Sequence, residues 1–365
     1  MVIEDILKKA EAGECISVEE ARKLWDSAPL ARLMQAAHAR RMELHPEPIV
    51  TWQIDRNVNI TNCCISGCRF CNFHCTPAQS DKIFVTTIEE YSRKIEEMLR
   101  LGGDQLLLQG GLHPKFDVEW YETLFKELKR RYPDVKLHAL GPPEVDYIAR
   151  RSSLTVEQTL ERLRLAGLDS LPGAGAEILD NEIRKKISPG KCSADRWCEV
   201  MHIAHTMGFA TSATMMYGHI ETIDQRLVHL EKVRTLQSQV PDGMPGFLAF
   251  IPWIFRSTGT RLETEDGVTT RFSSVEYLRL IAISRLMLNN IPNIQASWLT
   301  VGAQTAQLSL WGGANDMGSI MIEENVVSSA GAHNQFDANG MKAAIRQAGF
   351  TPRLRDQKYN LREEI

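Results

Sequence analysis

The 365-residue sequence has no long hydrophobic run. Its most apolar patch, Gly246 to Phe255, is short and contains Pro252, whereas a helix needs about 20 apolar residues to cross a bilayer. The first residues, Met1 to Ile6, are acidic and amphipathic, unlike the basic start and apolar centre of a signal peptide. We therefore expect a cytoplasmic protein that does not insert into a membrane.

The sequence also has no long basic run, and its formal net charge is −4. A nucleic-acid partner is not expected, because such partners are bound by clustered Lys and Arg residues. Ser/Gly-rich linkers, low-complexity tracts and residue-level repeats are absent as well. The 43% hydrophobic and 24% charged residues are ordinary for a globular protein. The length suits one large barrel or two domains.

Cysteine is scarce outside one stretch. Of eight cysteines, only Cys15, Cys192 and Cys198 lie away from it, and they form no paired-ligand motif. Five cysteines within thirteen residues, among Gly and Asn, would make a poor core segment. A ligand function for this stretch is therefore the better interpretation.

Three of the clustered cysteines, Cys64, Cys68 and Cys71, have the spacing C-x3-C-x2-C, and Phe70 directly precedes the third. Thiolates are the usual ligands of iron–sulfur clusters. Three on one loop can hold three irons of a four-iron cluster and leave the fourth iron open for a substrate or cofactor. Structural zinc is the alternative, with Cys63 or Cys75 as a fourth ligand.

Strand and helix patterns alternate from about residue 48. Buried apolar strands that alternate with helices predict parallel β/α units and an α/β fold. We expect a barrel of the triosephosphate-isomerase type with six to eight units; a doubly wound open sheet is the alternative. The expected strands are 49–62, 104–109, 135–140, 169–175, 209–217, 247–251 and 294–298, with a short eighth near 309–314. Helices are expected over 1–47, before a barrel over 48–335 and a C-terminal helix and tail over 336–365.

Unusual motifs follow the expected strands, where barrel enzymes place their chemistry. Gly110-Gly111 ends the second strand, and glycine lets the backbone approach a ligand closely, although such a pair is also common in turns. Glu177 ends the fourth strand, where a carboxylate can accept ribose hydroxyl hydrogen bonds or simply face solvent.

The cysteine pattern with its aromatic residue resembles the radical S-adenosylmethionine (SAM) superfamily. The resemblance implies a [4Fe-4S] cluster on Cys64, Cys68 and Cys71, with SAM chelated to the open iron and cleaved to a 5′-deoxyadenosyl radical. It also implies which residues contact the cofactor: Phe70 beside the cluster, Gly110 and Gly111 at the SAM amino group, Glu177 at the ribose and Arg196 at the SAM carboxylate.

Longer strings resemble the cyclic dehypoxanthinyl futalosine synthase family of the futalosine route to menaquinone. Aminofutalosine synthase and the coenzyme F420 ring-forming enzymes share the cysteine loop and the Tyr-Gly-His string, but Ile-Pro-Trp and Gln-Ala-Ser-Trp favour the cyclase. One departure is Asn-Phe-His-Cys after Cys71, where Ala-Phe-Tyr-Arg is expected; Cys63 is also extra. The strings lie at 110–114, 137–144, 172–178, 215–219, 250–253, 290–298 and 323–328.

This resemblance implies that the substrate is dehypoxanthine futalosine. The radical would take the hydrogen from C4′ of the ribose, and the carbon radical would add to the benzoate ring, with a reducing donor such as flavodoxin or ferredoxin. Candidate residues are Tyr217, His219, His138 and Glu144 for catalysis and Gln295, Ser297 and Asp316 for substrate contacts, with His113 and His333 as further possibilities. The alternatives are aminofutalosine synthase, a non-catalytic zinc protein, and a barrel hydrolase.

Overall fold

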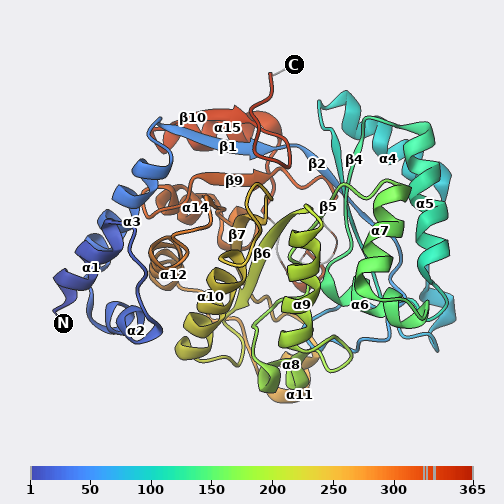
Figure 1. The fold of residues 1–365 in the computed structure, drawn as a ribbon, viewed down its shortest axis with the longest axis horizontal. Helices are drawn as coiled ribbons and strands as arrows, with labels where there is room; N and C mark the ends of the chain where they lie inside the picture. Colours follow the sequence, from blue (N-terminus) through green and yellow to red (C-terminus); the bar gives the residue numbers. More distant parts are fainter. Residues whose placement is uncertain (1, 324, 326–327, 332–333, 364–365) are drawn as a thin grey trace.

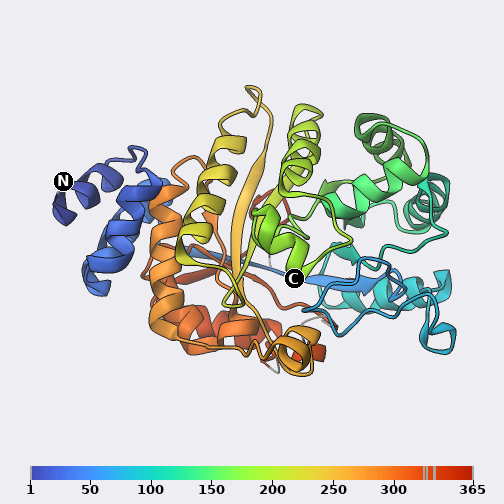
Figure 2. The ribbon, with the colours of Figure 1, turned by 90° about the horizontal axis from the view of Figure 1, so that it is seen from below.

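A computed structural model describes residues 2–323, 325, 328–331 and 334–363 (Figure 1). It begins with three helices, α1 (Ile3–Glu11), α2 (Val18–Ser27) and α3 (Leu30–Leu44). Figure 2 shows these blue helices on one side of the molecule, beside the orange helix α12 (Ser274–Met287). Arg279 of α12 donates to the carbonyl of Ala28 at 2.9 Å, which ties the two parts together.

The central sheet is parallel throughout. In the described residues, β2 to β8 are hydrogen-bonded in sequence order, and a second set runs β10-β1-β9. This order confirms the expected parallel β/α barrel. The strands are β1 (Ile49–Gln53), β2 (Asp55–Asn59), β3 (Gln105–Gln109), β4 (Lys136–Ala139), β5 (Ser170–Leu171), β6 (Ala210–Tyr217), β7 (Phe247–Ile254), β8 (Asn293–Ile294), β9 (Asp316–Ser319) and β10 (Thr351–Leu354).

The barrel closes through β9. Its Asp316 carbonyl accepts from the amide of Ala296 after β8 at 2.8 Å, and on the other side the Ile320 amide donates to Gln53 of β1 at 3.1 Å. Because β1 and β2 are consecutive parts of one strand, interrupted only at Ile54, these bonds complete a ring of eight parallel strand positions, at the upper limit of the expected six to eight units.

Helices surround the ring, and their ends follow the local sequence signals. Ser17, Thr87 and Thr155 each form a capping box with the residue three positions later. The helices after the first strand are α4 (Ile88–Arg100), α5 (Val118–Arg131), α6 (Pro142–Arg151), α7 (Val156–Ala166), α8 (Asn181–Ile187), α9 (Ala194–Thr206), α10 (Ile223–Gln237), α11 (Arg261–Asp266), α12, α13 (Trp298–Val301), α14 (Ala303–Leu310) and α15 (Ala338–Gln347), with 3-10 turns at Ser80–Lys82 and Ser328–Ala330.

The expected eighth strand near 309–314 is wrong. Ser309 and Leu310 belong to the buried face of α14, and the strand is β9, which begins at Asp316. Its residues are all buried, yet Asp316, Gly318 and Ser319 lack the apolar character by which buried strands are recognised. The expected strand 169–175 is also reduced to the two residues of β5.

The C-terminal segment does more than follow the barrel as a helix and tail. β10 pairs in parallel with β1 (Figure 1), and the chain then brings Arg355, Gln357 and Tyr359 into the barrel interior. Arg362 pairs with Asp104, just before β3, at 3.2 Å. Because β3 begins beside Asp104, this segment covers the amino-terminal end of the barrel. The division at residues 47 and 335 stays a prediction.

No helix within the described part of the chain is both long enough and apolar enough to cross a bilayer.

Asp316 holds the C-terminal segment, and its loss is expected to destabilise the fold. Arg355 donates to both carboxylate oxygens, at 2.6 and 2.9 Å, and the hydroxyl of Thr51 donates at 2.5 Å. Removing one partner of a buried ion pair costs about 3–5 kcal/mol. We therefore expect Asp316→Asn to lower the free energy of unfolding in urea by a few kcal/mol.

The exposed pair Lys185–Glu182 supplies the control, because Glu182→Gln should cost less than about 1 kcal/mol. An Asp316→Asn protein as stable as the wild type, with weakened substrate binding, would contradict this account and return Asp316 to its expected substrate role.

Candidate active site

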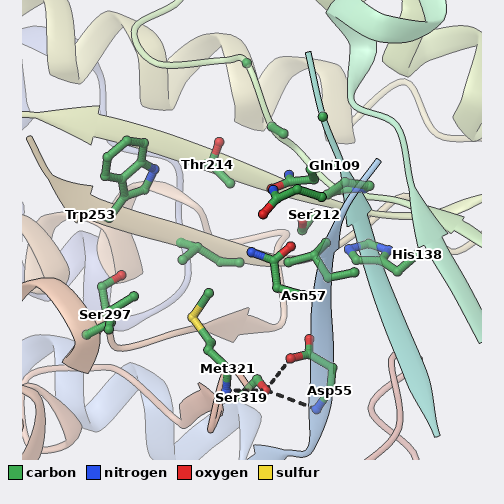
Figure 3. Close-up of a pocket in the computed structure, with 18 of the residues that line it drawn as sticks. Asp55, Asn57, Gln109, His138, Ser212, Thr214, Trp253, Ser297, Ser319 and Met321 are labelled. Atoms are coloured by element: carbon green, nitrogen blue, oxygen red, sulfur yellow. Dashed lines mark hydrogen bonds between the residues drawn. The ribbon is translucent and has the colours of Figure 1, made fainter. Parts of the chain in front are cut away.

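A cavity of about 370 Å³ occupies the barrel interior. Figure 3 shows that its polar side chains come from several strands: Asp55 and Asn57 from β2, Gln109 from β3, His138 from β4, and Ser212 and Thr214 from β6. Trp253 of β7 faces the same space from another side. The strands therefore hold residues far apart in sequence around one small-molecule-sized chamber.

The cysteine loop contributes Cys64, Cys68 and Cys71 to the wall of this cavity. The Ser66 hydroxyl lies 2.9 Å from the sulfur of Cys64 and 3.3 Å from that of Cys68. The backbone amide of Leu112 also points at the Cys64 sulfur, at 3.3 Å. A backbone amide aimed at the Cys64 sulfur favours its thiolate, which is the form that binds metal, whereas burial raises the pKa of the Cys68 and Cys71 thiols. The local chemistry thus suits metal ligation.

The two extra cysteines are placed differently. Neither Cys63 nor Cys75 lines the cavity. The sulfur of Cys75 is 3.2 Å from the side-chain amide of Asn62 and 3.8 Å from the carbonyl of Lys82. The structure therefore separates these two from the three spaced as C-x3-C-x2-C.

Two glycines let neighbouring segments pack directly against the cysteine loop. A Cβ on Gly111 would lie 2.1 Å from the carbonyl oxygen of Cys63, and one on Gly190 would lie 2.6 Å from Cα of Ser66. The Gly190 amide donates to the Ser66 carbonyl at 2.9 Å. The loop is thus fixed from both the β3 side and the α9 side.

The three thiols in the cavity wall are compatible with a polynuclear iron–sulfur cluster. A structural zinc requires four ligands around one ion, whereas cluster cysteines each bind a different iron. Three thiols in the wall of one cavity match the second arrangement.

A buried ion pair stands beside the cysteines. The ammonium of Lys191 donates to Glu177 at 2.8 Å and lies 5.4 Å from the ring centre of Phe70, and both Lys191 and Phe70 line the cavity. Burial alone would lower the pKa of Lys191, but the negative charges of Cys68 and Glu177 raise it well above its usual range. Lys191 is therefore a fixed positive charge next to the cluster loop.

The pKa values of two ionisable side chains in the cavity wall, Glu144 and His138, are shifted in opposite directions. Burial raises the pKa of Glu144 to about 7, with Lys191 opposing the shift. Burial, with the nearby charge of Arg355, lowers the pKa of His138 to about 3. The Nδ1 atom of His138 is 2.7 Å from the Ser170 hydroxyl. His138 is thus neutral at pH 7 and a weak base, while Glu144 exchanges a proton near neutral pH.

Two family models match the chain: the radical SAM superfamily over residues 58–233, and the CofH/MqnC C-terminal region over residues 244–365. The cyclic dehypoxanthine futalosine synthase of Streptomyces coelicolor is 43% identical over 98% of this chain and 88% of that protein. The chain belongs to the radical SAM superfamily. It is a radical SAM enzyme, and its C-terminal third belongs to the CofH/MqnC type.

Other relatives agree with this membership. The protein of the same name from Halalkalibacterium halodurans is 41% identical over 99% of this chain and 95% of its own. A 5-amino-6-(D-ribitylamino)uracil–L-tyrosine 4-hydroxyphenyl transferase from Methanopyrus kandleri is 38% identical over 90% and 88%. Among solved structures, methylornithine synthase (PylB) superposes with a TM-score of 0.72 at 20% identity, covering 96% of this chain and 98% of its own, which shows the shared fold.

The structure brings most of the expected site residues of this radical SAM enzyme together. The cavity is lined by Cys64, Cys68, Phe70, Cys71, Gly110, Gly111, His138, Glu144, Glu177, Gln295 and Ser297. Ser297 donates to the Pro252 carbonyl at 2.6 Å, so part of its bonding capacity is already used. Their roles remain predictions. His333 lies outside the described residues.

Five expected residues lie outside the cavity wall: His113, Tyr217, His219, Arg196 and Asp316. His113 stacks on Phe116, with 3.8 Å between the ring centres. Tyr217 is buried behind the wall, stacked on Tyr277 with 6.3 Å between ring centres. His219 lies between the Met216 carbonyl and the carboxylate of Glu221, 3.1 Å from each. Arg196 pairs with Asp146 and Glu199, and Asp316 with Arg355. The hydroxyl of Tyr217 has no hydrogen-bond partner among the described residues. The roles expected for these side chains stay predictions.

Sequence reasoning missed three groups in the cavity wall. Lys191 follows Pro189-Gly190 in a loop, where a lysine carries no distinctive signal. Arg355, Gln357 and Tyr359 come from a segment expected to be a tail. The polar residues of the first strand could have been found from the sequence. Gln53, Asp55, Asn57 and Asn59 occupy every second position, and a two-residue period places side chains on one face of a strand.

Glu144 is expected to make stability depend on pH. The folded protein keeps the Glu144 proton between pH 4.5 and about 7, because the pKa rises from 4.5 to about 7, whereas the unfolded chain releases it. This contribution is complete below pH 4.5 and is lost as the pH rises to about 7. The Tm of the wild type minus that of Glu144→Gln should therefore fall across this window and then level off.

Glu182→Gln, at a side chain that is 74% exposed, is the matched control and should show a constant difference. A difference that rises with pH for Glu144→Gln would contradict the raised pKa.

Proposed function

We propose that this radical SAM enzyme cyclises dehypoxanthine futalosine to cyclic dehypoxanthinyl futalosine in menaquinone biosynthesis. One observation carries the proposal. Two strings distinguish the cyclase family from its sister enzymes: Ile251-Pro-Trp253 and Gln295-Ala-Ser-Trp298. Ile251, Trp253 and all four residues of the second string line the same cavity as the cluster cysteines. The names of the 43% and 41% identical relatives agree.

The residues present fit the cofactors of this chemistry. Cys64, Cys68 and Cys71 would hold a [4Fe-4S] cluster, with SAM against Gly110, Gly111 and Glu177. We propose Lys191 in place of Arg196 for the SAM carboxylate, since Lys191 lines the cavity and Arg196 does not. When bound and reduced by a donor such as flavodoxin or ferredoxin, the cluster and SAM supply the 5′-deoxyadenosyl radical that takes the C4′ hydrogen.

The chain's own residues would position the substrate and handle the proton. Leu248, Ile251, Trp253 and Leu299 form an apolar part of the wall that excludes water and holds an aromatic ring. Restoring aromaticity to the benzoate ring requires loss of a proton and an electron, and SAM, which is consumed, would be the net oxidant of the reaction. Glu144 is a better proton acceptor than His138, because its pKa of about 7 is matched to neutral pH and that of His138 is about 3.

The test is a product analysis. Anaerobically reconstituted, reduced protein is given SAM and dehypoxanthine futalosine, and the products are read by mass spectrometry. We expect a product two mass units lighter than the substrate, formed together with 5′-deoxyadenosine. 5′-Deoxyadenosine without any change in the substrate would overturn the cyclase assignment and leave the superfamily membership intact.

The second candidate is a sister radical SAM reaction, favoured by the 38% identical transferase named for 5-amino-6-(D-ribitylamino)uracil and tyrosine. The same assay with those two compounds separates the candidates. Aminofutalosine synthase activity is tested in the same way, because its radical adds to a vinyl ether and leaves the adenosyl group in the product.

A further inference from the structure

The first barrel strand presents an unusual polar face to the cavity. Gln53, Asp55, Asn57 and Asn59 all line it and are only 2–6% exposed. The interior of such barrels is normally filled with branched apolar side chains. Four successive inward positions with carboxamide or carboxyl groups therefore need a reason other than core packing.

Several polar atoms of this face have no hydrogen-bond partner among the described residues. They are Nε2 of Gln53, Oδ1 of Asn57 and Nδ2 of Asn59, joined by the hydroxyl of Tyr359. All four belong to cavity-lining residues. A buried polar group without a hydrogen bond destabilises the folded protein. These groups are thus directed at something that fills the cavity.

The hydrogen-bonding character of the face indicates the ligand chemistry. Each carboxamide offers an NH2 group that donates and a carbonyl oxygen that accepts. Asp55 accepts from the Ser319 hydroxyl and brings a further carboxyl group. A carboxylate ligand only accepts hydrogen bonds and would meet these acceptors unfavourably. Sugar hydroxyls both donate and accept, so they suit every position of the face.

The other side of the cavity suits a different part of the ligand. Figure 3 shows Trp253 across the chamber from Asn57 and Asp55. Leu248, Ile251 and Leu299 also contribute to the wall. This apolar surface matches an aromatic ring, which leaves the hydroxyl-bearing end for the first strand.

We propose that the inward face of the first strand, carried by Asn57 and Asn59 with Asp55 beside them, binds the hydroxyl groups of a pentose, while the aromatic ring of the same molecule lies against Trp253. Naming that molecule dehypoxanthine futalosine depends on the proposed function. The pentose face itself depends only on the geometry of the cavity.

The test measures binding without turnover. Titration calorimetry follows dehypoxanthine futalosine added to the reconstituted, SAM-loaded but unreduced protein. Asn57→Leu and Asn59→Leu should each weaken binding about tenfold or more. The Tm of Asn57→Leu without substrate should be equal to or above that of the wild type, because a buried amide whose oxygen is unpaired is replaced by an apolar group of similar size. Asn59→Leu also removes the 3.2 Å hydrogen bond from Asn325, so its Tm should fall by no more than the loss of that one bond explains. Asn339→Leu, on the exposed surface of α15, should change neither quantity.

An analogue lacking one pentose hydroxyl sharpens the test. The wild type should bind the analogue more weakly than the parent compound. The variant that lacks the asparagine contacting that hydroxyl should bind the analogue and the parent compound equally well. Wild-type affinity in both variants would overturn the pentose face and leave the proposed function standing.

If the wild type does not bind dehypoxanthine futalosine, the proposed function fails instead. The pentose face is then tested with 5-amino-6-(D-ribitylamino)uracil, which carries a pentitol chain. Weaker binding by Asn57→Leu and Asn59→Leu supports the face, and unchanged or absent binding overturns it.

Discussion

Replacing any one of Cys64, Cys68 or Cys71 with alanine is expected to abolish SAM cleavage by the reconstituted, reduced protein. Each of the three lines the cavity, and each would bind a separate iron, so no neighbour replaces a missing ligand. The measurements are 5′-deoxyadenosine formation and the iron and sulfide content of the protein. Both should fall to the level of protein that has not been reconstituted.

Cys63→Ala and Cys75→Ala are the matched controls, because they remove a thiol from the same loop. Both should retain a reducible cluster, since neither side chain lines the cavity and Cys75 contacts Asn62 and Lys82 instead. Loss of the cluster in Cys75→Ala would contradict the three-ligand assignment. A colourless, zinc-loaded wild type after reconstitution would revive the non-catalytic alternative.

The second large effect is expected at Lys191. Lys191→Met removes the 2.8 Å partner of Glu177, and the carboxylate keeps only the longer contact to Arg184, at 3.4 Å. Breaking a buried pair costs about 3–5 kcal/mol, and we expect a loss near the lower end because Arg184 remains. SAM binding, measured by calorimetry on the unreduced protein, should weaken about 10- to 100-fold, as for loss of one charged hydrogen bond.

Two further variants separate stability from binding. The double variant Lys191→Met/Glu177→Gln should recover most of the lost stability, because no unpaired carboxylate remains, but it should not recover SAM affinity. Arg196→Met, at the position expected from the resemblance, should leave SAM affinity unchanged. The opposite result, with Arg196→Met weakening SAM binding and Lys191→Met having no effect, would reverse the assignment.

Local sequence patterns were sufficient for much of the architecture. The capping boxes at Ser17, Thr87 and Thr155 are present in the structure, because a cap is made by residues three positions apart. β3, β4 and β6 lie where their apolar runs predicted. β9 was missed because its residues are polar, and they are buried only through partners such as Thr51, far away in sequence.

Some residues of the candidate site could also be predicted from local sequence, and others could not. The cysteine ligand set could be predicted because its three members lie within eight residues of one loop, so their spacing alone brings them together. Tyr217 and His219 could not be placed by such reasoning. They lie at a strand end, as expected, but whether a side chain faces the cavity or the surrounding helices depends on strand register and on neighbours such as Tyr277 and Glu221.

By itself, the sequence determined the cysteine loop, the parallel barrel and the superfamily, because each is encoded in short-range spacing or in a repeated pattern. Only the tertiary structure decided that Lys191, and not Arg196, stands beside the cysteines. It also decided that Arg355 reaches across some 300 residues of chain to Gln53, and that four polar side chains of the first strand face the cavity. Such contacts form where the barrel closes. They join segments that are far apart in the chain, and neither segment's local sequence predicts the contact.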